Sequence, residues 1–519
     1  MSNDGKDLNP SGKQESKSVD PVVFWGTFII TGLFVIWGLL DVESLSAAFD
    51  AAMGFLTGEL GWVYLFYGTI VLFLVLFFGF SRFGQIKLGK PDDDPEYSTR
   101  SWIAMLFSAG MGIGLVFWGV AEPINHYAYP PIAEGETAAA AEQALEFSLF
   151  HWGLHPWALY AIFGMMLAYF SFRRGLPQLP SSLLYPLGEN VAEGLIGKTF
   201  DIFCGFLSLV GIATSLGLGA MQINSGLGEL FGLPVTTTAA VTIIVVITIA
   251  FIISAITGID RGIKYLSNAN ITIGSVLLIL MIVLGPTFFI MNYLAAGVGG
   301  YLDNIFSMSF FTSPVEQSPW PGWWTIFYWA WWTSWVPWVG GFIGRISKGR
   351  TIKEFVMGVL FVPTMASFVW FATMGGSGIY LERFGGGGIV EAVNQDVASA
   401  FFVTLTSFPG GVLMAVLATI LIATFFTTSA DSGTFVLGML TSRGIKEPSK
   451  RTKVVWGTFE GLIAVVLLLA GGLDAVQSAA ISASLPFILF IWVVIYVFYK
   501  TIKKDYQMSR EGEFIGEIK

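Results

Sequence analysis

The sequence predicts an all-α membrane protein that crosses the bilayer twelve times, and its composition is the first observation behind this prediction. Only 12% of the 519 residues are charged and 54% are hydrophobic, and the mean hydropathy is +0.70. Soluble domains carry about 25% charged residues, so this chain has too little charge to cover a water-facing surface. We therefore expect an integral membrane protein.

The second observation is the number of long apolar segments. A membrane-spanning helix needs about 20 mostly apolar residues. Twelve segments satisfy this requirement, near residues 22–40, 62–81, 102–126, 148–171, 201–221, 235–256, 268–293, 323–343, 355–378, 411–439, 454–471 and 479–499.

The third observation is the placement of basic residues in the loops. Of the 27 Lys and Arg residues, 26 fall in the two tails and in the alternate loops on the same side, and only Arg383 falls on the other side. Lys and Arg concentrate on the cytoplasmic side of membrane proteins. The sequence therefore predicts a multi-pass protein of the cytoplasmic (inner) membrane with both termini in the cytoplasm.

The segments outside the spans are short. Residues 1–21 are polar and of mixed charge, which predicts a disordered cytoplasmic tail. Residues 501–519 form a short cytoplasmic C-terminal tail. Between the seventh and eighth spans, residues 295–322 form an external segment in which 297–311 alternate at near-helical spacing. This spacing predicts a helix in the membrane interface, and a solvated loop is the alternative.

Composition also excludes several classes of site. The single cysteine, Cys204, excludes intramolecular disulfides and cysteine-based zinc sites. A net charge of -9 argues against nucleic acid as a partner. His151 and His155 have the i, i+4 spacing of metal ligands, but no acidic third ligand follows and Pro156 interrupts the turn. We therefore expect no metal there and no cofactor.

Three alternating glycines interrupt the third span in its middle. Gly110, Gly112 and Gly114 each weaken a helix by about 1 kcal/mol relative to alanine, and a broken helix exposes backbone groups that only a cavity or ligand can satisfy at membrane depth. This pattern predicts an unwound stretch beside a site. Close helix packing through a G-x-x-x-G motif is the alternative, and spacing does not separate the two.

The eighth span is rich in tryptophan. Eight tryptophans lie in 320–338, at positions 320, 323, 324, 329, 331, 332, 335 and 338. An aromatic belt occupies only the membrane rims, so it explains Trp320 to Trp324 but not the deeper residues. Trp331, Trp335 and Trp338 share one face, and a quaternary ammonium cation is the ligand that best matches several aromatic faces.

A second aromatic set opens the fourth span, where Trp152 and Tyr160 lie along one stripe with Trp157 a turn beyond. Three acidic residues also lie inside apolar segments, Glu122, Asp431 and Glu460. Acidic residues at such depth mark a pathway or a packing site. Because Glu122 precedes a proline near the end of its span, we expect it to make a structural cap or loop contact.

Six strings in this order resemble the betaine/choline/carnitine transporter family: AGMGIGLVFWGVAEP, FHWGLHPWALY, SLGLGAMQ, YLSNAN, WTIFYWAWWTSWVPWVGGFIGRISKGRTIKEF and TFFTTSADSGT. The resemblance implies two inverted five-helix repeats of the LeuT-like fold, in residues 101–294 and 323–500. Two peripheral helices in 22–100 would precede them. It also implies a homotrimer in the lipid bilayer.

The resemblance also implies the substrate site. It makes Trp152, Trp157, Tyr160 and Trp332 an aromatic box around the trimethylammonium group. It places two further tryptophans on the path to the box, Trp331 and Trp335. We expect the backbone of Gly110, Gly112 and Gly114 to meet the substrate carboxylate, as broken helix ends meet anions.

The implied sodium site lies between the third and tenth spans. Its ligands would be the carbonyls near Ser108 and Met111, the carbonyl of Phe425, and the hydroxyls of Thr428 and Ser429. Hard oxygen ligands suit such a cation, although both hydroxyls could instead bond to the preceding helical turn.

A second sodium site of the family would need two hydroxyls on the fifth span. Ser208 supplies one, but Ile212 stands at the other position and cannot ligate a cation. The two-sodium stoichiometry is therefore not supported.

These features predict a transporter, not an enzyme. The leading hypothesis is sodium-coupled uptake of a methylated onium zwitterion, either glycine betaine or a dimethylsulfonium analogue. No Asp or Glu stands beside the expected box in the sequence, which favours a zwitterion because an unpaired buried cation is costly. The alternatives are sodium-independent exchange of carnitine-type or betaine-type substrates, and choline import.

Overall fold

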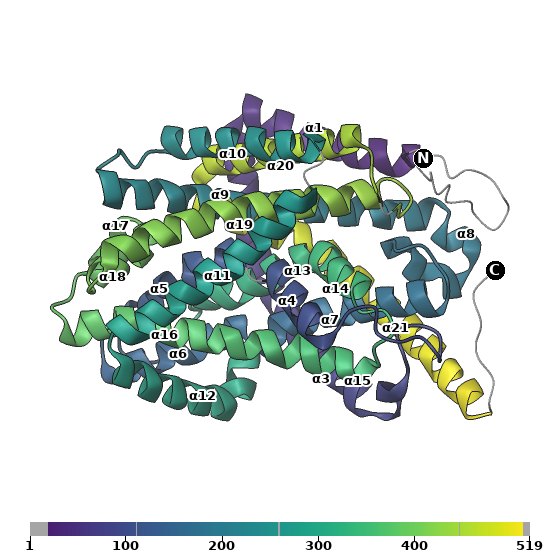
Figure 1. The fold of residues 1–519 in the computed structure, drawn as a ribbon, viewed down its shortest axis with the longest axis horizontal. Helices are drawn as coiled ribbons and strands as arrows, with labels where there is room; N and C mark the ends of the chain where they lie inside the picture. The colour runs from purple at the N-terminus through teal and green to yellow at the C-terminus, as the bar shows by residue number, and fades with distance from the viewer. Residues whose placement is uncertain (1–18, 111, 258–259, 446, 512–519) are drawn as a thin grey trace.

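The computed structural model describes residues 19–110, 112–257, 260–445 and 447–511. These residues form helices and the connections between them, and most helices run roughly along the long axis of the molecule (Figure 1). The one pairing of extended backbone among the described residues is an isolated bridge between Lys87 and Thr351. The all-α prediction is therefore confirmed.

Eight helical stretches of the described chain are long and apolar enough to cross a membrane, or nine if one sharply bent pair counts as a single span. They are α1 (Pro21–Leu40), α3 (Gly61–Phe80), the run of α6 (Ala138–Trp152), α7 (Leu154–Ala168) and η2 (Tyr169–Arg173), α9 (Leu195–Phe231), the run of α15 (Ile352–Val356), η6 (Met357–Phe361) and α16 (Val362–Phe384), α19 (Gly411–Leu440), α20 (Lys450–Gly471) and α21 (Leu473–Arg510). They have the composition of a polytopic membrane protein, and the count of twelve stays a prediction.

The four other predicted spans are also helical: one is interrupted, one is sharply bent, and one contains two π-helical turns. They contain α4 (Thr99–Gly110) and α5 (Ile113–Ala128), α10 (Thr237–Thr257), the bent pair α11 (Asp260–Leu284) and α12 (Thr287–Ser309), and the run of η4 (Gly322–Ile326), α13 (Phe327–Trp335), η5 (Val336–Gly340) and α14 (Gly341–Arg345). The break in the third span and the two π-helical turns of the eighth fall in the segments to which the sequence assigns the site.

The seventh predicted span ends earlier than the sequence analysis placed it. Helix α11 stops at Leu284, and α12 leaves it at an angle of 109°. Pro286 lacks a backbone N–H and disfavours helical backbone at Gly285, so the helix cannot continue through this pair. Helix α12 then includes most of 297–311, so that segment is helical and is not a loop.

Several shorter helices join the long ones: α2 (Val42–Gly58), η1 (Arg82–Gln85), η3 (Pro180–Leu187), α8 (Glu189–Ala192), α17 (Ile389–Gln395), η7 (Val397–Ser399) and α18 (Ala400–Thr406). The sequence analysis did not predict α2. Its N-terminus is capped by Asp41, whose carboxylate accepts from the backbone N–H of Ser44 at 3.0 Å.

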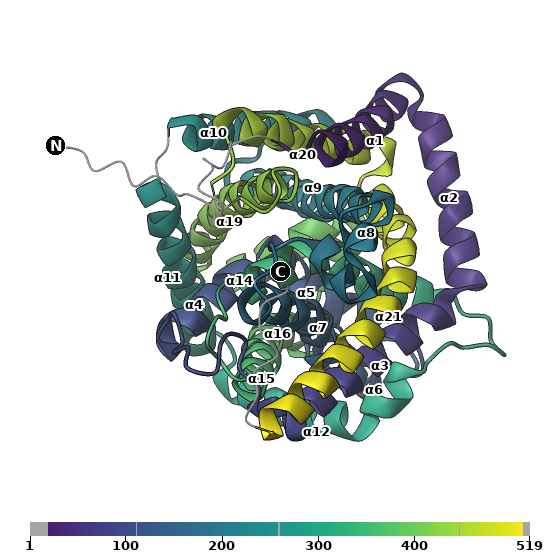
Figure 2. The same ribbon diagram turned by 90° about the vertical axis from the view of Figure 1, so that its right-hand side faces the viewer.

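The helices that carry the expected site occupy the interior. Figure 2 shows α5, α7 and α14 in the middle of the molecule, with α9, α19 and α21 around them and α2 on the outside. Among the largest fully buried side chains are Trp118 of α5 and two tryptophans of α13, Trp329 and Trp331. The aromatic residues of these segments therefore pack in the protein core and do not face the lipid.

A buried ion pair fixes the end of α21. Arg173 donates through Nη2 to Asp505 Oδ1 at 2.9 Å and through Nε to Oδ2, and its Nη1 donates to the carbonyl of Gly89 at 3.0 Å. Tyr169 donates its hydroxyl to the same carboxylate. The predicted C-terminal tail therefore begins as helix, since α21 continues to Arg510.

Candidate functional site

The four residues expected to form the aromatic box line one small cavity. Trp152 comes from the end of α6, Trp157 and Tyr160 from α7, and Trp332 from α13. The cavity volume is about 10 Å³, which is room for about one water molecule, and the remaining lining residues are Gly110, Pro156 and Ser367. All four aromatic side chains are at most 4% exposed, so the cavity is a desolvated site.

The rings of these residues meet at nearly right angles. The ring centroids of Trp152 and Trp332 are 4.7 Å apart at 81°, and those of Trp157 and Tyr160 are 5.6 Å apart at 80°. Perpendicular rings present faces to the cavity from different directions. Because the faces of aromatic rings are electron-rich, this arrangement suits a rounded cation without hydrogen-bond donors.

The fourth predicted span is not one continuous helix. Helix α6 ends at Trp152 and α7 begins at Leu154, with Gly153 in a non-helical conformation between them. Pro156 has no N–H to donate to the carbonyl of Trp152, which is the bond that would continue the helix. Trp152 and Tyr160 therefore do not share a stripe on a single helix, and the break turns Trp152 toward the cavity.

The predicted interruption of the third span is confirmed. Helix α4 ends at Gly110, α5 begins at Ile113, and Gly112 between them is extended. The glycines also allow close packing: a Cβ on Gly110 would overlap the ring of Trp157, and one on Gly114 would lie 2.5 Å from the ring of Trp331. The break places Gly110 and Gly114 on different helices, so they do not form a G-x-x-x-G face, although both positions leave room for an aromatic ring.

Trp331 and Trp335 lie next to the cavity but are not among its lining residues. Trp331 stacks on Trp332 with centroids 4.8 Å apart, and its Nε1 donates to Thr214 Oγ1 at 2.9 Å. The Nε1 of Trp335 donates to the carbonyl of Gly211 at 2.8 Å. Both bonds fix α13 against α9 and so hold Trp332 in place.

Trp320, one of the tryptophans assigned to the membrane rim, is buried. Trp320 and the partly buried Trp324 pack against His126, with ring centroids 5.0 and 4.4 Å away, whereas Trp323 is 55% exposed. The assignment of Trp320 to an aromatic belt is therefore wrong. No pattern near these tryptophans indicates that a histidine from α5 packs against their rings.

The sodium residues of the tenth span lie on one turn of α19. The hydroxyl of Thr428 donates to the carbonyls of Thr424 and Phe425 at 3.0 and 3.2 Å, which is the alternative bonding that the sequence left open. It also accepts from Nδ2 of Asn270 at 3.1 Å, a contact that sequence reasoning missed. The Ser429 hydroxyl lies 3.7 Å from where a Cβ on Gly112 would stand.

The contact between Ser429 and Gly112 brings the tenth span to the break in the third span. A hydroxyl oxygen of α19 therefore lies beside the non-helical backbone of Gly112. Of the two remaining ligands, Ser108 lies in α4, and Met111 lies outside the described residues. In α9, the hydroxyl of Ser208 donates to the carbonyl of Cys204 at 2.8 Å, and its neighbour Ile212 is buried.

Glu122 lies immediately behind the aromatic box. It is fully buried in α5, and its Oε2 accepts from Trp152 Nε1 at 2.7 Å and from the hydroxyl of Tyr328. Its Oε1 lies 2.7 Å from Nδ1 of His151 and 3.3 Å from Nε2 of His126. The expectation of a cap or loop contact is wrong, because the proline that follows does not end α5.

The two histidines of the fourth span contact different partners. His151 contacts Glu122, whereas Nε2 of His155 lies 3.1 Å from the hydroxyl of Ser309 and its ring stacks on Trp329. Ligand atoms of Glu122, His126 and His151 lie within 4.8 Å of one another. Ordinary hydrogen-bond lengths account for the approach of His151 to the carboxylate.

The family model described as betaine/carnitine/choline family transporter matches residues 22–507. The chain belongs to this family. It is 46% identical to the glycine betaine transporter OpuD of Bacillus subtilis (strain 168), over 95% of this chain and 96% of that protein. It is 40% identical to the ectoine/hydroxyectoine transporter of Virgibacillus pantothenticus, over 95% and 98% of the two chains.

A third relative is the osmo-dependent choline transporter BetT2 of Acinetobacter baylyi, which is 38% identical over 94% of this chain and 72% of that protein. Family membership confirms the resemblance seen in the sequence. The protein is therefore a multi-pass membrane transporter of a small molecule, and it is not an enzyme.

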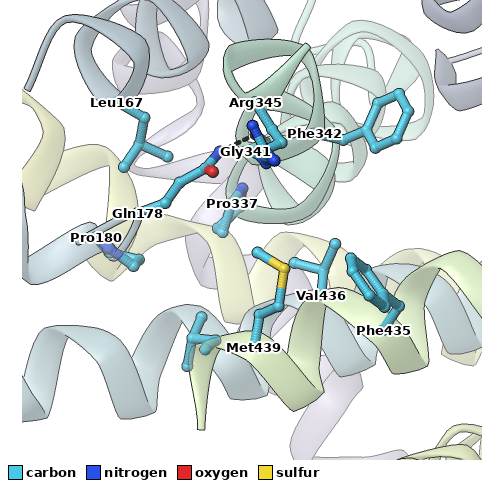
Figure 3. Close-up of a pocket in the computed structure, with 11 residues that line it drawn as sticks. Leu167, Gln178, Pro180, Pro337, Gly341, Phe342, Arg345, Phe435, Val436 and Met439 are labelled. Atoms are coloured by element: carbon cyan, nitrogen blue, oxygen red, sulfur yellow. Dashed lines mark hydrogen bonds between the residues drawn. The ribbon is translucent and has the colours of Figure 1, made fainter. Parts of the chain in front are cut away.

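A second cavity of this betaine/carnitine/choline family transporter lies further along the helix that carries Trp332. Pro337, Gly341 and Arg345 line one side of it, and Phe435 and Met439 of α19 line the other (Figure 3).

A hydrogen bond closes one side of this second cavity. The side chain of Gln178 reaches across and donates through Nε2 to the carbonyl of Gly341 at 2.8 Å, as Figure 3 shows.

Proposed function

We propose that the protein imports a methylated onium zwitterion, glycine betaine or a dimethylsulfonium analogue, by sodium symport. The observation that carries this proposal is the single desolvated cavity whose walls are Trp152, Trp157, Tyr160 and Trp332. A methylated onium head has no conventional hydrogen-bond donor and is attracted to the faces of such rings.

The opposite end of the substrate needs a group that binds its carboxylate. Gly110 lines the cavity at the end of α4, and α5 begins three residues later at Ile113. The N-terminus of a helix binds anions through its backbone N–H groups and its dipole. The break in the third span therefore supports a zwitterion that spans from the rings to the start of α5.

The same break supports sodium coupling. The hydroxyl of Ser429 on α19 lies close to Gly112, with Thr428 one residue before it, and hydroxyl and carbonyl oxygens suit a hard cation. An ion there would contact the α4–α5 break from one side while the substrate contacts it from the other. The two ligands would then stabilise the same arrangement of the broken helix, which is the basis of coupling.

The break in the third span and the π-helical turns of the eighth support alternating access. Such transporters bind substrate at the midplane beside discontinuous helices that begin two inverted repeats. Helices α4 and α5 are separated at Gly112, and α13 lies between two π-helical turns. We propose that these two segments begin the repeats 101–294 and 323–500.

Choline import is the second candidate function. Glu122 places a carboxylate behind Trp152, and a buried cation needs a counter-charge. The carboxylate does not line the cavity, however, so a zwitterion that carries its own counter-charge remains the preferred substrate.

The deciding experiment is uptake of labelled glycine betaine by proteoliposomes with and without an inward sodium gradient. Unlabelled choline is the competitor. Sodium-dependent accumulation and weak inhibition by choline at equal concentration are expected. Uptake that does not depend on the sodium gradient would favour exchange. Inhibition by unlabelled choline as strong as that by unlabelled betaine would favour choline import.

A further inference from the structure

The hydrogen bonds of Glu122 join two of the three tryptophan walls of the box, Trp152 and Trp332. Its Oε2 accepts directly from Nε1 of Trp152 at 2.7 Å. The same oxygen accepts from Tyr328, whose ring stacks on Trp332 with centroids 5.9 Å apart. Its Oε1 contacts His151, whose backbone carbonyl accepts from Nε1 of Trp332 at 3.0 Å.

We propose that Glu122 is a positioning and specificity-determining residue of the substrate site. Its carboxylate fixes the plane of Trp152, and its negative charge, one indole ring behind the cavity, attracts the onium head of the substrate. This inference rests on the proposed function, because it assigns to Glu122 a part in recognition of the same cationic group.

The positioning role follows from the donor inventory. An indole N–H can only donate, and a buried N–H without an acceptor is costly. Trp152 is 4% exposed and Glu122 is its recorded acceptor. A charged acceptor makes the shorter and stronger kind of hydrogen bond, so the carboxylate restrains the ring that meets Trp332 at a right angle.

The charge role follows from the surroundings of the carboxylate. The groups that face it are the Trp152 N–H, the Tyr328 hydroxyl and the rings of His126 and His151. Nε2 of His151 lies 2.9 Å from the hydroxyl of Thr325, which can donate to it. We infer that the His151 ring is neutral with its proton on Nδ1. This tautomer donates to Glu122 and accepts from Thr325, and it leaves the charge of the carboxylate uncompensated.

The two roles make different predictions for two ligands. The Glu122 carboxylate attracts a cation such as choline without any opposing term. In glycine betaine, the Glu122 carboxylate also repels the carboxylate of the substrate, which offsets part of the attraction to the onium head. At a separation of roughly 8 Å and an effective dielectric constant of about 20 to 40, loss of the charge would weaken choline binding about tenfold and betaine binding about two- to threefold. Loss of ring position alone would weaken both equally.

The test is Glu122→Gln, which keeps an acceptor oxygen for Trp152 and removes the charge. Inhibition of labelled glycine betaine uptake by unlabelled choline and by unlabelled betaine gives the two affinities in the same proteoliposomes. A ratio of affinities that shifts against choline by about threefold or more supports the charge role. An unchanged ratio would overturn it.

Three further variants separate the roles and guard against misfolding. Trp152→Phe keeps a ring without the N–H and should weaken both ligands by a similar factor; unchanged affinities would overturn the positioning role. Glu122→Asp keeps the charge and should therefore retain the native ratio of choline to betaine affinity. A ratio that shifts against choline in this variant would overturn the charge role, even if Glu122→Gln does not fold.

Glu460→Gln is the matched control, because Glu460 is a buried acidic residue of α20 that bonds to Thr434.

The unmutated protein distinguishes failure of this inference from failure of the proposed function. Absence of betaine and choline uptake by that protein would overturn both. Betaine uptake that responds to sodium, together with a choline-to-betaine ratio that no Glu122 variant changes, would overturn only the role of Glu122.

Discussion

Substitution of Trp332 by alanine is the most direct perturbation of the aromatic box. Trp332 is 3% exposed, lines the cavity and meets Trp152 with centroids 4.7 Å apart. One wall of a desolvated cation–π site is worth about 2 kcal/mol. Because 1.4 kcal/mol corresponds to a factor of ten, we expect Trp332→Ala to weaken substrate binding about 30-fold.

The assay is binding or uptake of labelled glycine betaine as a function of its concentration, in detergent and in proteoliposomes. Trp323→Ala is the matched control on the same segment, because that side chain is 55% exposed and lies outside the cavity. Trp320 would be a poor control, since it is buried against His126. Native affinity in a correctly folded Trp332→Ala protein would refute the box as placed.

Three other substitutions test the rest of the site and the fold. Thr428→Ala combined with Ser429→Ala should raise the sodium concentration for half-maximal uptake by about tenfold or more, because two oxygen ligands are lost; an unchanged sodium dependence measured by uptake would exclude this site. Gly110→Ala should reduce betaine affinity at least tenfold, because the methyl group overlaps a ring of the box wall, and native affinity would show that the wall is free to move. Asp505→Asn leaves the buried Arg173 without its charged partner, so we expect the free energy of unfolding to fall by about 3 to 5 kcal/mol. This loss is measured as a lower thermal midpoint in detergent, and an unchanged midpoint would contradict the importance of the pair.

The sequence by itself determined the class of the protein and the chemistry of its candidate cavity. Low charge and long apolar segments are sums over local composition, so they do not depend on knowing which helices touch. The interruption near Gly112 was also predictable, because three alternating glycines weaken a helix wherever it packs. The aromatic residues of the cavity were assigned through the family resemblance, because the depth of the tryptophans alone indicates Trp331, Trp335 and Trp338, which do not line the cavity.

Prolines within two apolar segments break the helices that the apolar pattern predicts as continuous. Gly285 and Pro286 end α11, although the apolar pattern runs on through them. Pro156 breaks the fourth span beside Trp152. In both places apolar character and helical continuity are separate properties, because a proline removes a backbone donor without making the segment polar.

Only the tertiary structure decided which polar groups stand behind the cavity. Trp152 is 30 residues from Glu122, and the Trp332 indole is 181 residues from the His151 carbonyl that accepts from it. A buried donor must find an acceptor, but the sequence does not say which of several buried acceptors it meets. That choice depends on how α5, α6 and α13 pack together, which is why Glu122 looked like a helix-end contact in the sequence and lies against the box in the structure.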